Sequence, residues 1–282
     1  MNRIDRWLFA AGSAHSLACA RVVLASALAL RVALGPYRGL TDRPDALFDP
    51  PPVLEWLGSV PSAWVIVAVQ VVGFAAAVAA VLGWRPRTTF ALAWVALLFL
   101  GGLRDSFGKI LHNDVLLLLV CLPFLVAPLG VRLGDRTRRS AYGFALRAGL
   151  LIAGAAYLFC GIQKLRHSGI DWVTSDNMRW IMDGAARSAR SPAPDLARLI
   201  ADTPWLATVL AAAVLGLELT FVLCVPVVRL RPLVLVAAVG LHVGTALLLG
   251  IDYWGWIAAD AAVLVSWDRF TVNPFRPQPA EP

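Results

Sequence analysis

The sequence is poor in charged residues and in the short motifs that mark common catalytic sites. Charged residues make up 15% of its 282 residues, whereas about a quarter is usual in a soluble domain. The four cysteines form no CxxC pair, so neither a disulfide framework nor a zinc site is indicated. The four histidines show no HxxxH, HxxH or HExxH spacing, and GxSxG and P-loop motifs are absent. A histidine-box di-iron enzyme is therefore excluded, and we expect no metal site.

Long hydrophobic runs are what the sequence has instead. Hydrophobic residues make up 59% of the chain, and its mean hydropathy is +0.71. Residues 56–84 and 232–251 contain no Asp, Glu, Lys or Arg, and about 20 apolar residues are enough for a helix to cross a bilayer. The runs lack the alternation that is typical of membrane-barrel strands. We therefore predict an all-α fold, a polytopic transmembrane helical bundle.

We expect about eight transmembrane helices in one domain that covers residues 17–267. A cytoplasmic amphipathic lead, residues 1–16, would precede this domain, and a short cytoplasmic tail, residues 268–282, would follow it. The last expected span is short and contains Asp260, so seven is the alternative count. The eight spans are expected at residues 17–35, 62–83, 88–103, 114–130, 144–163, 205–228, 232–250 and 253–267.

Basic residues are concentrated in short segments on one side of these spans. Because Lys and Arg are enriched in cytoplasmic loops, we predict a cell-membrane protein with both termini in the cytoplasm. The two long loops, residues 36–61 and 165–204, then lie outside, where acids balance their basic residues. The net charge of +7 thus reports membrane topology rather than nucleic-acid binding. The basic residues assigned to the cytoplasmic side are Arg3, Arg6, Arg85, Arg87, Arg132, Arg136, Arg138, Arg139, Arg229, Arg231, Arg269 and Arg276.

Ionisable side chains inside the expected spans are the main candidates for function, because they are costly in a bilayer unless they pair or serve a site. Tyr157, Gly161 and Lys164 are three or four residues apart, so they would share one face of a helix. Gly161 would allow another helix or a ligand to approach closely. A lysine in an apolar environment loses its proton more readily and can act as a base. The alternative is that Lys164 extends to the lipid headgroups.

Other polar side chains in the spans are expected to have partners or to serve a site. Glu218 and His242 lie near the middles of their helices, where a Glu218–His242 or a Glu218–Arg pair is one expectation and a ligand site is the other. Asp260 is expected to meet a partner on a neighbouring helix. Its candidate partners are Arg21 and Arg31 of the first span.

His112, Asn113 and Asp114 open the fourth expected span. Asn113 is expected to cap that helix, and the carboxylate of Asp114 is expected to stabilise its first turn. This arrangement leaves His112 without a structural role.

A series of short motifs runs through the apolar part of the sequence. They are ARVVL around Arg21, RGL at 38–40, LGWRPRTT at 82–89, LHND at 111–114, YLFCGIQKL at 157–165 with Asp171 and Trp172 following, LGLELTFVL at 215–223 and GLHVGTALLLGIDYW at 240–254. Their order resembles that of the HTTM family, the transmembrane module shared by vitamin K-dependent gamma-carboxylases and many bacterial membrane proteins. The resemblance covers residues 17–267, and we expect no counterpart of the soluble C-terminal domain of the carboxylases.

The resemblance implies quinone chemistry. In the carboxylases the matching lysine deprotonates reduced vitamin K, whose oxidation produces the strong base that prepares glutamate for carboxylation. Carried over by motif, Lys164 would be the base, and His112 and His242 would be catalytic hydrogen-bonding residues near the quinone oxygens. The implied cofactor is a quinone of the menaquinone or vitamin K type. The family has two adjacent lysines where this sequence has Gln163 and Lys164. The expected ligand-binding residues are Tyr157, Gly161, Glu218, Asn113 and Trp172.

Three hypotheses for function follow. The leading one is an outward-facing site within the membrane for a quinone or another lipid-like molecule, with hydroquinone oxidation or carboxylation as its reaction. The second is a non-enzymatic membrane subunit that helps to mature or export a secreted peptide, which would dock on loops 36–61 and 165–204. The third is a small-solute transporter, although neither inverted repeats nor broken helices are evident.

Overall fold

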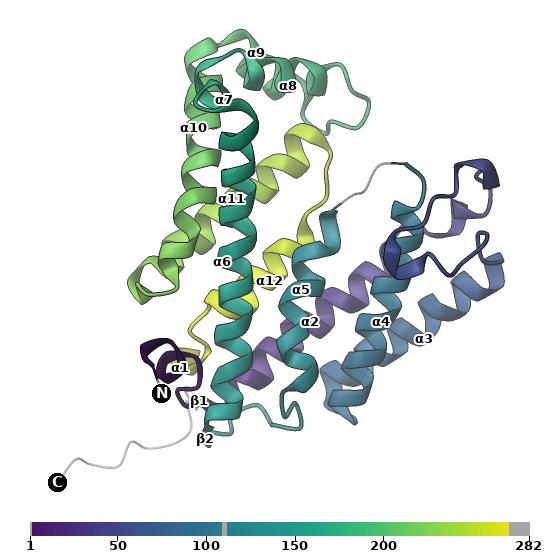
Figure 1. The fold of residues 1–282 in the computed structure, drawn as a ribbon, viewed down its shortest axis with the longest axis vertical. Coiled ribbons are helices and arrows are strands. Elements are labelled where there is room, and N and C mark those ends of the chain that lie inside the picture. Colours follow the sequence, from purple (N-terminus) through teal and green to yellow (C-terminus); the bar gives the residue numbers. More distant parts are fainter. Residues whose placement is uncertain (1, 109–111, 271–282) are drawn as a thin grey trace.

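The computed structural model describes residues 2–108 and 112–270 (Figure 1), and within them the chain is mostly helical. This confirms the all-α prediction. Leu111 of the LHND motif and the tail residues 271–282, with Arg276, lie outside the described residues. The α-helices are α1 (Arg3–Leu8), α2 (Ala14–Leu34), α3 (Ala63–Leu82), α4 (Pro86–Asp105), α5 (Val115–Val126), α6 (Ser140–Ser168), α7 (Asp171–Thr174), α8 (Asn177–Ala186), α9 (Pro194–Asp202), α10 (Pro204–Thr220), α11 (Arg231–Leu249) and α12 (Trp254–Leu264).

Short elements connect these helices. An antiparallel pair of two-residue strands, in which Gly12 pairs with Arg139 and Ser13 with Arg138, joins the start of α2 to the start of α6. The strands are β1 (Gly12–Ser13) and β2 (Arg138–Arg139), and the 3₁₀ helices are η1 (Arg38–Leu40), η2 (Asp45–Leu47), η3 (Pro52–Leu54), η4 (His112–Asp114), η5 (Phe221–Cys224), η6 (Val228–Leu230) and η7 (Trp267–Phe270).

Six helical stretches in the described residues are long and apolar enough to cross a membrane, and each coincides with an expected span. The other two expected spans, residues 114–130 and 253–267, contain the shorter apolar helices α5 and α12. The chain is therefore a polytopic membrane protein. The count of about eight spans becomes six long helices and two short ones, while the orientation of the termini stays a prediction.

The outer surface of the bundle is apolar, as lipid contact requires. Only 28% of the apolar stretch of α3 is buried within the protein, and its exposed residues include Val71, Val72 and Leu82. Exposed apolar surface of this extent is rare in soluble monomers. The interior is lined instead by α2, α5, α6 and α12, and α12 packs against the other three of these helices and against α11.

The expected long loop 165–204 is in fact mostly helical. It folds into α7, α8 and α9, which lie at the end of α6 and α10 opposite to β1 and β2 (Figure 1). These short helices have their own apolar cluster, in which Met178 and Met182 of α8 pack with Ile200 of α9 and Leu248 of α11. The segment is therefore a folded cap on one end of the bundle.

Arg21 and the turn after α3 show how buried polar groups are accommodated. The Nη1 atom of Arg21 donates hydrogen bonds to the carbonyl oxygens of Leu129 (2.6 Å) and Val131 (3.0 Å), which follow α5. Gly83 ends α3 with a φ of +80°, a conformation that favours glycine. Arg21 was expected as a partner for Asp260. That expectation is wrong, because carbonyls beyond the end of α5 take its donors.

The close contact between α3 and α4 gives a test of this packing. A Cβ atom at Gly73 would lie 2.4 Å from the Cβ of Ala96 and 3.3 Å from Cγ1 of Val32. We expect Gly73→Leu to lower the free energy of unfolding in detergent micelles by about 1–3 kcal/mol, because it forces α2, α3 and α4 apart. The matched control is Gly216→Leu in α10, where a Cβ meets no atom within 4 Å. Equal stability of the two variants in thermal unfolding would contradict the packing.

Candidate functional site

One face of α6 carries the polar residues around which the candidate site is built. Tyr157 is 1% exposed, and Gly161 and Lys164 follow it on the same side of the helix. A Cβ atom at Gly161 would lie 2.8 Å from Cδ2 of Leu219 and 3.2 Å from the Cβ of Glu218. The glycine therefore allows α10 to approach α6 closely. This approach brings the carboxylate of Glu218 within reach of Lys164.

Lys164 and Glu218 form a partly buried ion pair. The Nζ atom of Lys164 donates to Oε1 of Glu218 at 2.5 Å, and the two side chains are 22% and 9% exposed. The same Nζ lies 5.2 Å from the centroid of the Trp172 ring in α7, a cation–π arrangement. Glu218 was expected to pair with His242 or an arginine. It pairs with Lys164 instead, because the contact at Gly161 places these two side chains side by side.

Tyr157 is the centre of a second group of buried residues. Its hydroxyl lies 2.6 Å from Nε2 of His242 and donates to Oδ2 of Asp260 at 2.7 Å. The tautomer of His242 sets whether its Nε2 donates to this hydroxyl or accepts from it. Phe221 stacks on the Tyr157 ring at 4.0 Å, and Trp256 meets it edge-on at 5.5 Å. We call these five residues the Tyr157 cluster.

Asp260 was expected to meet a partner on a neighbouring helix, and it does so at Tyr157 of α6. The two candidate partners on the first span, Arg21 and Arg31, were wrong. Asp260 is fully buried in α12 and accepts its hydrogen bond from α6. Arg31 is engaged elsewhere, with Asp114 and Asp252. The Tyr157 cluster and the Lys164–Glu218 pair are neighbours nonetheless, because Tyr157 and Lys164 lie about two turns apart on the same face of α6.

His112 contacts the Tyr157 cluster through Trp256 and through Tyr253, a residue that was not among the expected site residues. Nε2 of His112 lies 3.0 Å from the hydroxyl of Tyr253, whose ring centroid is 5.4 Å from that of His242. Nε1 of Trp256 also donates to the carbonyl oxygen of His112 at 3.1 Å. The two histidines therefore lie on either side of Tyr253. The sequence feature that could have pointed to Tyr253 is its place in the aromatic end of the GLHVGTALLLGIDYW motif.

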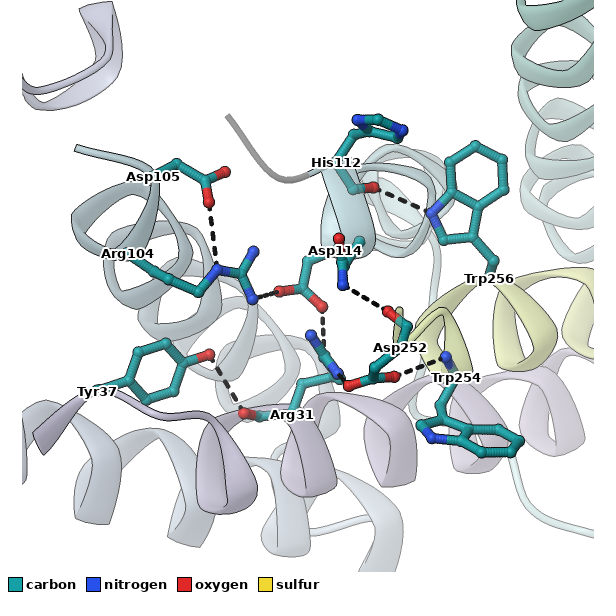
Figure 2. A network of polar contacts seen from close by, with 10 residues as sticks. Arg31, Tyr37, Arg104, Asp105, His112, Asp114, Asp252, Trp254 and Trp256 are labelled. Carbon is teal, nitrogen blue, oxygen red and sulfur yellow. Dashed lines mark hydrogen bonds and ion pairs between the residues drawn. The ribbon is translucent and has the colours of Figure 1, made fainter. Parts of the chain in front are cut away.

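An ion-pair network fixes the segment that carries His112 (Figure 2). Asp114 is 3% exposed and binds Arg31 through Oδ1 and Arg104 through Oδ2. Arg31 also pairs with Asp252, and Arg104 with Asp105 at 3.2 Å. The network thereby ties α2, α4, η4 and the loop before α12 to one another. This geometry positions His112 and Tyr253.

The expected capping role of Asn113 is wrong, because Asp114 rather than Asn113 is the residue that directly precedes α5. Asn113 donates from Nδ2 to the carbonyl oxygen of Asp252 at 2.6 Å, and no side-chain capping bond is made at the start of α5. The reason is that two guanidinium groups compete for the carboxylate of Asp114 more strongly than helix N–H groups do. Asn113 therefore supports the network, and it also lines the cavity beside that network.

Two cavities adjoin these groups. An apolar cavity of ≈ 210 Å³ lies beside the Lys164–Glu218 pair and includes Trp172 in its wall. Gly240 and Gly244 of α11 leave space there, because a Cβ atom at either would meet no atom within 4 Å. A second cavity of ≈ 350 Å³ lies beside the ion-pair network and is lined by Arg31 and Arg190 among others. The apolar cavity is lined by Trp172, Met178, Ile181, Met182, Leu210, Val214, Gly240, Leu241, Gly244, Thr245, Leu248 and Leu249.

Three buried polar atoms at the site have no hydrogen-bond partner among the described residues. They are Nε1 of Trp172, Oε2 of Glu218 and Oδ1 of Asp260. A buried polar atom without a partner costs about 1–3 kcal/mol, so such atoms are uncommon in folded proteins. One donor and two acceptors are thus available to a ligand or to water.

The structure brings most of the expected site residues together, in two adjacent groups. Lys164, Gly161, Glu218 and Trp172 form one, and Tyr157 and His242 belong to the other. His112 joins the second group through Tyr253. Within residues 2–108 and 112–270, no three His, Cys, Asp or Glu side chains are placed to hold a metal ion.

Comparison with known proteins assigns neither a family nor a function to this site. No protein-family model, no curated protein and no solved structure matches the chain. The fold and the site together define a polytopic membrane protein with a cluster of ionisable side chains inside an apolar bundle.

The ion-pair network gives a test of how the site is held. We expect Asp114→Asn to lower the free energy of unfolding by roughly 3–5 kcal/mol, because it leaves two buried guanidinium groups without their shared carboxylate. Asp183→Asn is the control, because its pair with Arg187 is largely exposed and is worth about 0–1 kcal/mol. The measurement is thermal unfolding of both variants in the same detergent. A loss no larger for Asp114→Asn than for the control would argue against the network.

Proposed function

We propose that this membrane protein binds a quinone or a similar lipid-like molecule beside the Lys164–Glu218 pair. The observation that carries the proposal is an apolar cavity whose wall includes Trp172, because the buried Nε1 of Trp172 has no partner among the described residues and its ring lies against Nζ of Lys164. Leu210, Val214 and Glu218 follow one another at four-residue intervals on α10, so the cavity wall and the ion pair share a helix face. An apolar tail fits the cavity, and a polar head group fits its edge.

The donors and acceptors at that edge suit a quinone head group. Nε1 of Trp172 and Nζ of Lys164 are donors for a carbonyl oxygen, and Oε2 of Glu218 is an acceptor for a hydroxyl. The resemblance to the HTTM family, which includes Tyr157, Gly161 and Lys164, points to the same residues. A bound hydroquinone would supply two electrons and two protons, which dioxygen would take up to leave quinone and hydrogen peroxide.

The geometry favours Glu218 rather than Lys164 as the proton acceptor. Lys164 donates its hydrogen bond to Glu218, and an ammonium group has no lone pair with which to accept a proton. Oε2 of Glu218 has such lone pairs and no partner among the described residues. In this proposal Glu218 takes the proton, and Lys164 stabilises negative charge on the neighbouring oxygen. The hydrogen bonds from His242 through Tyr157 to Asp260 offer a second place to hold a proton.

A second candidate function, a membrane subunit that docks a secreted peptide, is favoured by exposed apolar residues on the folded cap. Trp180 of α8 is 70% exposed, and Leu196 and Leu199 of α9 are exposed as well. An amphipathic surface of this kind is able to bind a peptide. Interfacial lipid also accounts for an exposed tryptophan, so we place this function second.

Filling the cavity tests where the ligand binds. We expect Gly244→Leu to weaken the binding of menaquinone by about tenfold or more, since its side chain would occupy the space for the apolar tail. Gly216→Leu, a glycine of α10 that does not line the cavity, is expected to bind as the parent does. Binding is measured by native mass spectrometry of the delipidated protein. Undiminished binding by Gly244→Leu would place the ligand elsewhere, and no binding by the parent would sink the quinone proposal.

Exchange of the carboxylate tests the chemistry separately from binding. We expect Glu218→Gln to retain menaquinone but to lower oxygen uptake with reduced menaquinone about a hundredfold or more, the size usual for loss of a general base. Lys164→Ala is expected to lower both, because it removes a donor and leaves Glu218 without its partner. If Glu218→Gln keeps full activity while Lys164→Ala abolishes it, Lys164 rather than Glu218 is the base.

A further inference from the structure

Three arginines line a cavity at the end of the bundle opposite to α7, α8 and α9. The cavity has a volume of ≈ 190 Å³ and includes Arg138 of β2, Arg147 of α6 and Arg231 at the start of α11. We call it the arginine pocket. Its wall includes residues of β1 and β2, and these strands lie at the other end of α6 from α7 (Figure 1). The other residues of the pocket are Ala11, Gly12, Ser13, Ser16, Gly143, Leu146, Val263, Val265, Ser266, Trp267 and Asp268.

The pocket carries an excess of positive charge. Arg138, Arg147 and Arg231 line one small cavity, so their like charges repel one another. Asp268 is the acid that lines the pocket. Partial burial opposes its ionisation, but hydrogen bonds from Ser13 and Ser16 and the nearby charge of Arg138 hold the pKa of Asp268 below its ordinary value. The carboxylate is therefore ionised near neutral pH and balances one of the three positive charges.

Backbone contacts hold the guanidinium groups in place. Arg147 donates to the carbonyl oxygens of Ala10 and Ala11, and Arg138 donates from Nη2 to Ala11 at 3.1 Å. Arg231 donates from Nε to the carbonyl oxygen of Cys224 at 3.2 Å. A guanidinium group has five N–H donors, so these anchors leave further donors that can converge on an anion. Such pre-positioned donors are what an oxyanion site requires.

The apolar part of the pocket indicates the source of the anion. Leu146 of α6 and Val263 of α12 line it beside the arginines, and so does Trp267 of η7. Arg231 is followed directly by the apolar run of α11. Arginine and tryptophan at the end of apolar helices are typical of the level at which lipid headgroups lie. A soluble anion would gain nothing from contact with the apolar wall, whereas a lipid would bury its acyl chain there.

We propose that the arginine pocket binds the phosphate of an anionic phospholipid. The headgroup phosphate would lie among Arg138, Arg147 and Arg231, and the glycerol and upper acyl chain would contact Leu146 and Trp267. The cavity is several times the ~30 Å³ that a water molecule takes up in the liquid, so it has room for a phosphate group. This site is separate from the proposed quinone site and does not depend on it.

Lipid binding to purified variants tests the proposal. Delipidated full-length protein in a neutral detergent is titrated with phosphatidylglycerol, with phosphatidylcholine and with inorganic phosphate, and binding is followed by native mass spectrometry and thermal stability. We expect phosphatidylglycerol to bind and to stabilise the protein, and the other two to have little effect. Arg147→Gln and Arg231→Gln should each weaken phosphatidylglycerol binding about fivefold, the loss expected for one basic residue.

Arg229→Gln is the matched control, because Arg229 is exposed two residues before Arg231 and does not line the pocket. It should leave the affinity unchanged. If Arg229→Gln weakens phosphatidylglycerol binding as much as Arg231→Gln does, the lipid is attracted by the basic surface as a whole, and the proposal of a specific site in the arginine pocket is wrong. If inorganic phosphate stabilises the protein as much as phosphatidylglycerol does, the proposal that the bound phosphate belongs to a lipid is wrong. Should Arg231→Gln fail to fold, Arg138→Gln carries the same test, because this side chain is 58% exposed.

Discussion

A bilayer offers no water to a polar side chain, so each charged group within this bundle has to meet its partner on another part of the protein. The main polar contacts of the interior are therefore also contacts between helices. Lys164 and Glu218 join α6 to α10, and Tyr157 and Asp260 join α6 to α12. Apolar packing alone distinguishes weakly among helix neighbours in lipid, because the lipid tails are as apolar as the side chains. Polar pairing supplies the missing specificity.

The same constraint separates the supporting residues from the candidate ligand site. At the ion-pair network both oxygens of Asp114 have guanidinium partners, and the result is a rigid junction of four segments. Beside α6 the carboxylates are only partly hydrogen-bonded, since Glu218 and Asp260 each keep an oxygen without a partner among the described residues. A fully satisfied group stabilises the fold, whereas a partly satisfied group retains capacity for a ligand. Arg31 and Glu218 are both largely removed from solvent, yet Arg31 pairs with two carboxylates whereas Glu218 keeps one oxygen without a partner among the described residues.

The sequence predicted the helices well and the contacts between them less well. Uncharged runs such as 56–84 locate helices directly, and the spacing of Tyr157, Gly161 and Lys164 places them on one helix face. The partners of Glu218 and Asp260 were wrong because pairing depends on which helices are neighbours, and local periodicity carries no information about that. For the same reason, Asp114 was expected to stabilise the first turn of its own helix, and its pairs with Arg31 and Arg104 were not foreseen.

The folded cap and the aromatic residues of the site were harder to foresee. Residues 165–204 contain mixed charge and several prolines, so hydropathy marked the segment as a loop although it forms α7, α8 and α9. Tyr253 lies in the connection before α12 and was not distinguished from neighbouring aromatic residues. Its role depends on the bend that brings it between His112 and His242, which is a property of the tertiary fold.

The shortness of α12 has a consequence for the biogenesis of the protein. Its 11 residues extend about 17 Å, against an apolar layer of about 30 Å, and they include Asp260. A segment this short and polar does not partition into lipid alone. It is accommodated when α2, α5 and α6 already provide a protein surface and the hydroxyl of Tyr157 is available to receive its carboxylate. Insertion of α12 is thus coupled to assembly of the helices that precede it, so this segment would leave the translocon only after the chain has begun to fold within the membrane.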